Sequence, residues 1–180
     1  MSVPIGNINK IPQADVSHSD TLTASGTYDE YNAVGQTSDN DFSTYHGVHR
    51  NNPDDGTCTV SITSEHTWSV AKDLNPVKFK LYARAYPHGN YATSSYTFTV
   101  WVKQGTSWTQ IYSSSSSGSS DISETPNQTL TTGWEGVTGI KAYAYATAYS
   151  YEGDRQQDCY AYVYEVQGFY RKKKCYSGVV

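Results

Sequence analysis

The sequence is poor in the residues that usually build helical cores. Leucine occurs at only four of 180 positions and methionine once, whereas tyrosine occurs 17 times and serine and threonine are abundant. Leucine and methionine favour helices, and aromatic and β-branched residues favour strands. The composition therefore argues against a helical protein and indicates an all-β chain, long enough to bury the core of one domain.

Positive charge and long apolar runs are also scarce. Thirteen lysine and arginine residues against 17 acidic residues leave a formal net charge of −4, so we expect no nucleic-acid partner, which would need a basic face to neutralise phosphates. No apolar run approaches the roughly 20 residues of a bilayer span, so we expect no membrane insertion. The N-terminal residues lack a basic segment followed by an apolar one, and no secretory signal is visible.

Cysteine is rare as well, and the spacings of the three cysteines match no zinc or redox motif. Two interpretations stay open. Cys58 and Cys159 both lie in strand-like segments and would form one disulfide, which leaves Cys175 as a free thiol. Alternatively, all three are thiols that act as small apolar side chains.

Motifs of catalysis are absent. The chain has no nucleophile elbow, no metalloprotease helix, no phosphate-binding glycine loop and no dinucleotide fingerprint. His46 and His49 are the only close pair among scattered histidines, and no third ligand follows them at a suitable spacing. Acidic residues could meet in space as a glycosidase pair, but no pattern singles any of them out. We therefore predict that the protein is not an enzyme.

Alternation of polar and apolar side chains predicts a series of strands without a convincing helix. The expected strands are 21–27, 57–64, 77–85, 96–103, 108–112, 128–132, 140–150 and 158–170. The turn at 104–107 makes 96–112 a hairpin. The turn-rich segment 46–56 reads as an exposed loop, and the serine run 113–120 as a flexible one. This pattern predicts an antiparallel β-sandwich or jelly roll.

The expected domain is flanked by two segments. Residues 1–20 carry Pro4 and Pro12 without a sustained period, and we expect an extended arm that packs on its own domain or on a neighbour. The β-sandwich domain is expected at 21–170. Residues 171–180 begin with the basic run Arg171–Lys174 and form either a solvated tail or a dock for an acidic partner.

The last two expected strands alternate tyrosine with alanine or valine. Tyr143, Tyr145 and Tyr149 share one side of the first strand, and Tyr160, Tyr162 and Tyr164 share one side of the second. The tyrosines are either core or an amphipathic platform for a glycan or a protein partner. Six exposed tyrosines would leave little else to fill the sandwich, so we favour core for at least one strand.

The segment Thr37–Tyr45 concentrates oxygen donors. Asp39 and Asp41 lie one residue apart, and Ser43 and Thr44 follow. Carboxylate and hydroxyl oxygens in one tight loop suit a calcium-type ion. The alternative is that both aspartates accept hydrogen bonds from turn amides.

Several of these segments together resemble the galactose-binding-like jelly roll family, which includes discoidin or F5/8-type domains and carbohydrate-binding modules. The resemblance covers most of 21–170. Its anchors are Asn32-Ala33, Asp39-Asn40-Asp41 with Ser43-Thr44-Tyr45, the hairpin S-Y-T-F-T-V-W-V-K-Q-G-T-S-W-T-Q-I-Y and the closing Y-V-Y-E-V-Q-G. An insertion at 34–38, and Asn40 where the family often has glycine, depart from the family pattern.

The resemblance implies a structural calcium ion and a ligand site on the loops at one end. By position, the calcium ligands are the side chains of Asp39 and Glu165, with oxygens from Gln36, Asp41, Thr44 and the Tyr164 carbonyl. Sugar sites need an aromatic face and planar polar groups for vicinal hydroxyls. The loops that offer both give the candidate ligand residues His46, His49, Arg50, Arg84, His88, Tyr91, Tyr149 and Arg155.

Two functions follow from the resemblance and the chain. The first is a non-catalytic recognition module that binds glycans on a surface, in adhesion or attachment. The second is a structural or decorating subunit of a large assembly such as a phage or virus capsid or tail, in which the jelly roll contacts neighbouring protein subunits or further copies of itself. Both functions imply an extracellular-facing or virion-surface location.

Overall fold

The computed structural model describes residues 8–32, 37, 41–52, 56–89, 91–151 and 157–171. The described chain is almost entirely strand, with one short 3-10 turn, Gln13–Asp15. The strands are β1 Ile8–Lys10, β2 Ser17–Ala24, β3 Asp29–Tyr31, β4 His46–Asn52, β5 Gly56–Tyr86, β6 Thr93–Gln104, β7 Ser107–Gly118, β8 Ile122–Glu124, β9 Asn127–Leu130, β10 Trp134–Ser150 and β11 Gln157–Arg171.

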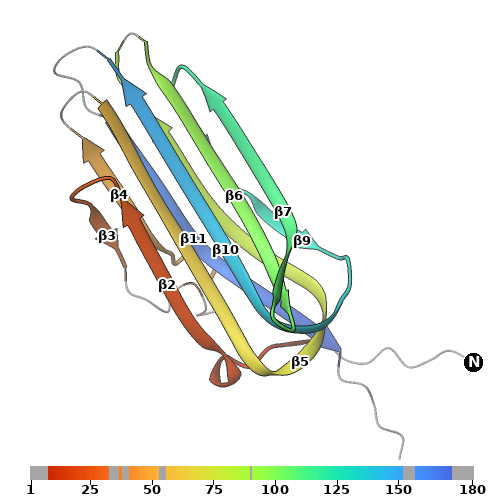
Figure 1. The fold of residues 1–180 in the computed structure, drawn as a ribbon. Coiled ribbons are helices and arrows are strands. Elements are labelled where there is room, and N and C mark those ends of the chain that lie inside the picture. The colour runs from red at the N-terminus through yellow and green to blue at the C-terminus, as the bar shows by residue number, and fades with distance from the viewer. Residues whose placement is uncertain are drawn as a thin grey trace, which may run out of the picture.

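Strand β5 connects the two layers of the fold (Figure 1). Its first half pairs with β2 and β10, and its second half pairs with β11, β8 and β9. We call the layer β2–β5–β10–β6–β7 the front sheet, and the layer β3–β4–β11–β5, with β1, β8 and β9 at its margins, the back sheet. Every described pairing is antiparallel. The β-sandwich expected from the sequence is confirmed.

The centre of the core is lined with alanine. Strands β10 and β11 belong to opposite sheets and contact each other without pairing, so that the alanines of β10 face Ala161 and Val163 across the interior. Larger side chains from neighbouring strands fill the remaining volume, chiefly Phe79, Phe98 and Ile62, all fully buried. Both predicted tyrosine rows consequently lie on the outer faces of their sheets, whereas Tyr170 near the end of β11 belongs to the core. The expectation that at least one tyrosine row lies in the core is wrong, because the adjacent strands supply the bulk.

Two segments expected to be loops are strands. Segment His46–Asn52 is β4, which pairs with β11 on one side and with β3 on the other and buries Val48 completely. The serine run up to Gly118 belongs to β7, which pairs residue by residue with β6 at the edge of the front sheet. An edge strand needs only backbone hydrogen bonds on one side, so serine side chains that bury little apolar area are tolerated there. The expected 96–112 hairpin is present, with Gly105 at φ +60° in its turn.

The N-terminal segment packs on its own domain where it is described. Strand β1 pairs with the end of β11, and β2 pairs with the first half of β5. Of the tail expected at 171–180, Arg171 ends β11 and residues 172–180 lie outside the described residues, so the role of the tail stays a prediction. Within the ranges that the structure describes, no helix has the length and apolar character needed to cross a membrane.

Cys58 and Cys159 are free thiols in the core. The Cys58 thiol donates a hydrogen bond to the carbonyl of Arg50 (3.3 Å), and the Cys159 thiol donates to the carbonyl of Cys58 (3.1 Å). The neighbouring Cys58 and burial raise the pKa of the Cys159 thiol. Cys175 lies outside the described residues. The structure therefore agrees with the interpretation in which Cys58 and Cys159 are thiols and not a disulfide.

Candidate functional site

The outer face of the back sheet carries a dense aromatic cluster. We call it the back-sheet cluster; it comprises Tyr31, Tyr45, His49, Tyr82, Tyr160, Tyr162 and Tyr164. The outward positions of β11 and β5 supply four of these rings, because residues at every second position of a strand share one face. Strands β3 and β4 and the residue before β4 supply the others.

The rings of the back-sheet cluster are packed against one another. Tyr45 stacks on Tyr162 with ring centroids 4.5 Å apart and planes 18° apart, and His49 stacks on Tyr160 at 4.2 Å and 10°. Tyr162 is only 8% exposed, and burial raises its pKa. Its ring crosses β4 at Gly47, where any side chain would collide with it. These ring faces are already occupied, so the cluster acts mainly as a second, outer core.

The outer face of the front sheet carries a different arrangement. Tyr143, Tyr145 and Tyr149 point outward along β10, and Tyr151 follows directly after the strand. We call these four residues the tyrosine stripe. The Tyr143 and Tyr145 rings lie 6.3 Å apart with planes only 18° apart. Tyr149 is 37% and Tyr151 65% exposed, so the stripe becomes more accessible toward the end where β10 stops.

A further exposed ring lies near the upper end of the tyrosine stripe. Tyr91, in the loop before β6, is 78% exposed and precedes Thr93, which pairs with Tyr149. Three of the seven exposed large hydrophobic side chains of the described residues therefore lie at one end of the sandwich: Tyr91, Tyr149 and Tyr151. This upper end of Figure 1 is where β5 begins and β10 ends. We call it the loop end.

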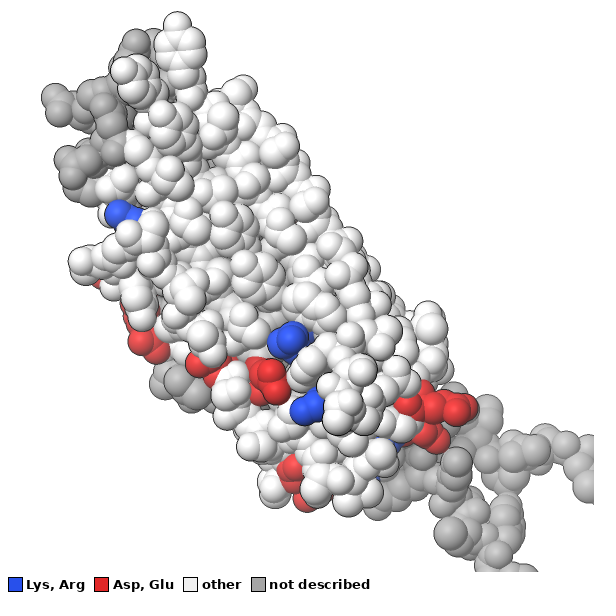
Figure 2. All heavy atoms as spheres, viewed as in Figure 1, with Lys and Arg blue, Asp and Glu red and all other residues white. Residues whose placement is uncertain are grey.

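Hydroxyl groups flank the tyrosine stripe on both sides. The pairing register places Tyr145 in a row with Thr23, Ser61, Thr97 and Ser115. The next row joins Tyr143 with Thr21, Thr63, Thr99 and Ser113. Figure 2 shows this face, with few Lys, Arg, Asp or Glu side chains over its upper part. The front face is thus aromatic along its middle and hydroxyl-rich beside it.

Several predicted ligand residues also lie near the loop end, on the other sheet. Arg84 donates two hydrogen bonds to Asp121, from Nε (3.1 Å) and from an Nη (2.7 Å). Its guanidinium lies 4.9 Å from the Tyr86 ring, and the His88 ring meets the same ring edge-on at 4.0 Å. The structure therefore brings Arg84 and His88 together around Tyr86. Arg155 lies outside the described residues.

The other predicted ligand residues, His46, His49 and Arg50, belong to β4. His46 is 1% exposed: its Nδ1 lies 2.5 Å from Asp20 Oδ2, and its Nε2 lies 2.9 Å from Glu30 Oε1. It is an internal residue, because its side chain points into the space between β2 and β4. His49 Nε2 lies 3.2 Å from Asp158, and Arg50 donates to Ser25. Both side chains are thus held by partners within the protein itself.

His46 belongs to a buried polar network that the sequence did not reveal. His18 Nε2 lies 2.8 Å from Asp20 Oδ1, and the Ser64 hydroxyl lies 3.0 Å from His66 Nε2. Burial would raise the pKa of Asp20, but hydrogen bonds from His18 and His46 hold it far below its usual range. Burial lowers the pKa of His66 to about 3. Strands β2, β4 and β5 and residue Glu30 of β3 meet here, so only the tertiary fold assembles the network.

The predicted calcium loop is described only in part. Gln36 and Asp39 lie outside the described residues. Asp41 Oδ1 accepts hydrogen bonds from the Ser43 amide (2.8 Å) and hydroxyl (2.6 Å), and Thr44 Oγ1 donates to the Asp41 carbonyl (3.1 Å). These Ser43 bonds lower the pKa of Asp41. This is the turn that the alternative interpretation of the sequence describes.

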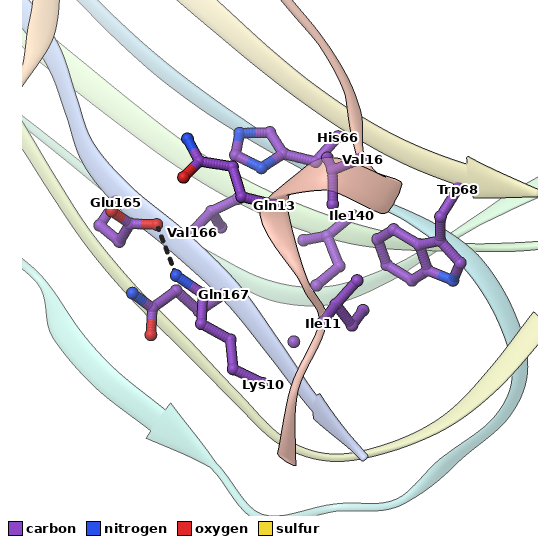
Figure 3. A pocket seen from close by; sticks show the side chains of 11 residues that line it. Lys10, Ile11, Gln13, Val16, His66, Trp68, Ile140, Glu165, Val166 and Gln167 are labelled. Atoms are coloured by element: carbon purple, nitrogen blue, oxygen red, sulfur yellow. Dashed lines mark ion pairs between the residues drawn. The ribbon is translucent and has the colours of Figure 1, made fainter. Parts of the chain in front are cut away.

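Glu165, the distant partner in the calcium prediction, is fully buried and faces Lys10. Their carboxylate and ammonium lie 3.9 Å apart beside a cavity of about 20 Å³ (Figure 3). The Tyr164 ring lies on the opposite face of β11, beneath Lys80 Nζ at 3.9 Å. No group of three or more His, Cys, Asp or Glu side chains suited to a metal ion occurs among the described residues. Calcium at this loop stays a prediction.

Comparisons with known proteins find solved structures that are similar to the chain at a low level. No family model and no curated protein matches it. The carbohydrate-binding module CBM32 of AlyQ, in complex with 4,5-unsaturated mannuronic acid, is 23% identical over 83% of this chain and 93% of that one, with a TM-score of 0.31.

Two further solved structures are similar to the chain at a comparable level. An F5/8 type C domain from Bacteroides fragilis is 9% identical over 93% of this chain and 99% of that one, with a TM-score of 0.39. The module TmCBM61, in complex with β-1,4-galactotriose, is 8% identical over 85% of this chain and 88% of that one, also at 0.39. Similarity at this level does not transfer a ligand, which has to be inferred from this chain's own residues.

Proposed function

We propose that the protein is a non-catalytic module that binds glycans at the loop end of the sandwich. The observation that carries this proposal is the exposure of Tyr91, Tyr149 and Tyr151 at one end. An exposed tyrosine ring offers an apolar face to the apolar side of a sugar ring, while its hydroxyl stays in water. Exposed aromatic side chains that gather in one place mark a binding surface more often than isolated ones do.

Planar polar groups near the same end support the proposal. The Arg84–Asp121 pair and His88 supply fixed donors and acceptors around Tyr86, and a guanidinium or a carboxylate can bond two neighbouring hydroxyls at once. A hydrogen bond ties Arg84 Nη2 to Asp121 Oδ2 at 2.7 Å, and Asp121 raises the pKa of the guanidinium, so the pair is held in place before any ligand arrives. Attachment to glycans on an extracellular-facing or virion surface is part of this proposal.

A glycan array followed by titration calorimetry tests the proposed function. We expect specific binding that falls about ten-fold or more when Tyr149 or Tyr151 is replaced by alanine, since each substitution removes one stacking face. Val70→Ala is the matched control, because Val70 is 62% exposed but lies in the bend of β5, at the opposite end. Silence on the array, or equal loss in the control, would overturn the proposal.

We also propose that a calcium ion binds at the loop that contains Asp41 and Thr44. Support comes from the oxygen donors concentrated in Thr37–Tyr45 and from the fully buried Glu165 carboxylate. If the ion binds the folded chain alone, excess calcium raises the melting temperature and a chelator lowers it, by mass action. An unchanged melting temperature under both conditions, measured by differential scanning fluorimetry, would rule out the proposed calcium site.

A further inference from the structure

We infer that the whole outer face of the front sheet binds a neutral, extended polysaccharide laid along β10. This inference rests on the proposed glycan binding and extends it from the loop end to a flat face. It commits to one class of ligand, an uncharged polymer of several sugar rings. Three properties of the face lead to it: a line of aromatic rings, regular rows of hydroxyls and the distribution of charge.

The aromatic line follows the strand axis. Four tyrosines of the tyrosine stripe span eight residue steps from Tyr143 to Tyr151, which is about 26 Å at about 3.3 Å per residue. Tyr143 and Tyr145 keep their ring planes within 18° of each other. A line of this length matches an extended chain of sugar rings, whereas a single sugar would need only one or two of the tyrosines.

The face beside the stripe is regular. Pairing of β10 with β5 runs without a register shift from Gly139 to Ser150, and pairing with β6 runs likewise from Gly139 to Tyr149. Neighbouring strands lie about 4.8 Å apart, so each tyrosine within β10 is flanked by hydroxyls at fixed intervals. Some hydroxyls bond each other, as Thr23 does with Ser61 (2.6 Å) and Thr59 with Thr147 (2.9 Å). Such rows offer both donors and acceptors to sugar hydroxyls.

Among the outward side chains of the front-sheet strands, charge is confined to the lower end. Glu65 pairs in register with Lys141, and Lys141 Nζ lies 4.9 Å from the Trp101 ring and 4.4 Å from the Trp108 ring. From the row of Tyr143 upward, the outward side chains of the described strands are threonine, serine and tyrosine. Because these outward side chains include no cation, the upper part of the face gives little counter-charge to an acidic polysaccharide. Electrostatic complementarity therefore selects a neutral polymer over a uronate chain.

The same composition disfavours a second copy of the chain as the occupant. Stable homodimer interfaces are more apolar than the general surface and contain fewer serines. The hydroxyl rows would have to be stripped of water against another protein surface, and every hydroxyl left without a partner costs free energy. A polysaccharide carries its own hydroxyls at close intervals, and these can form hydrogen bonds with the hydroxyls of the protein.

Pull-down on insoluble polymers tests the inference. Microcrystalline cellulose and chitin serve as neutral probes, alginate gel as the acidic probe, and soluble oligosaccharides report the loop end separately. We expect two variants, the double variant Tyr143→Ser/Tyr145→Ser and the single variant Thr97→Glu, to bind a neutral polymer at least ten-fold more weakly than the wild type. Thr129→Glu is the matched control, because it adds the same charge to an exposed position of β9 in the back sheet.

Each outcome separates the two proposals. Binding to a neutral polymer that the front-face variants lose and the control keeps supports the inference. Oligosaccharide binding that depends on Tyr149 and Tyr151, without loss of polymer binding in the front-face variants, overturns the inference and leaves the proposed function standing. Preference for alginate, or a dimer in analytical ultracentrifugation that Thr97→Glu dissolves, also overturns the inference. Binding to no glycan overturns both.

Discussion

Gly47 lies directly beneath the ring of Tyr162. A Cβ atom at Gly47 would lie 2.0 Å from Tyr162 Cδ1 and 2.7 Å from the carbonyl oxygen of Ala161. Both distances are far below van der Waals contact, so the ring and the strand have to move if any side chain is added. The outer aromatic core of the back sheet therefore depends on this one glycine.

Gly47→Ala is expected to destabilise the protein by about 3 kcal/mol, the upper part of the usual cost of overpacking. Urea denaturation followed by fluorescence measures the change. In a Tyr162→Ala background the same substitution should cost less, because the ring clash is gone and only the Ala161 carbonyl remains. Equal cost in both backgrounds would contradict the arrangement of the two residues.

The buried His66 gives the fold a defined acid sensitivity. Burial lowers its pKa from 6.5 to about 3, so between these values the unfolded chain binds more protons than the folded one. The contribution of neutral His66 to the free energy of unfolding is therefore complete above about pH 6.5 and is lost as the pH falls toward 3. We expect the wild type to lose about 2 kcal/mol between pH 7 and pH 4.5 through this residue. Denaturation at both pH values measures it.

His66→Gln provides the control, since glutamine keeps a hydrogen-bonding group near Ser64 but does not titrate. The variant should show a smaller loss of stability between pH 7 and pH 4.5 than the wild type. Asp20, whose pKa is lowered, adds acid sensitivity only below its ordinary value of 3.8. His46, whose pKa is raised, acts in the opposite direction: its contribution is present below 6.5 and is lost at higher pH. Identical pH profiles of variant and wild type would refute the role of His66.

Lys10 is expected to stabilise the fold through Glu165. Lys10→Met removes the ammonium that faces a fully buried carboxylate, and removal of one partner of a buried pair costs about 3 kcal/mol. The double variant Lys10→Met/Glu165→Gln should recover part of this loss, because no buried charge remains. Lys72→Met, which removes a lysine from the Tyr170 ring, is the control and should cost less. Thermal unfolding of the four proteins compares them.

The thiols of Cys58 and Cys159 are expected to be inaccessible in the native state. Both side chains are fully buried and donate hydrogen bonds to main-chain carbonyls. Alkylation with iodoacetamide, mapped by mass spectrometry, should modify the two residues only after denaturation. Labelling of the folded protein at either residue, or a Cys58–Cys159 disulfide in the purified protein, would contradict the structure.

Alternation along the chain predicted most strands, because period-two patterning is a local property. It could not decide which side of β10 and β11 is buried. The alternation of Ala142 and Tyr143 is the same whichever of the two side chains is buried. Which one is buried depends on the fact that β10 and β11 face each other across the centre of the core. The same limit applies to β4, whose turn-rich sequence becomes a strand because β3 and β11 pair with both of its edges.

The same limit applies to the candidate site. The sequence expects Tyr91 and Tyr149 in loops at one end; both are exposed, Tyr91 before β6 and Tyr149 within the last residues of β10. The sequence places His46 in a surface loop, but its partners Asp20 and Glu30 come from strands 26 and 16 residues away in the sequence. No local pattern signals such a network. The hydroxyl rows likewise appear only once the register of five strands is known.

Because β5 runs through both sheets as one strand of 31 residues, neither sheet can come apart alone. Separation of the front sheet frees the first half of β5, and the bend then no longer anchors the second half against β11. The sandwich should therefore unfold as a single cooperative unit, and the amide protons of β5 should exchange with solvent only when the whole domain opens. Under force from a bound polymer, the domain would thus unfold in a single step and not sheet by sheet.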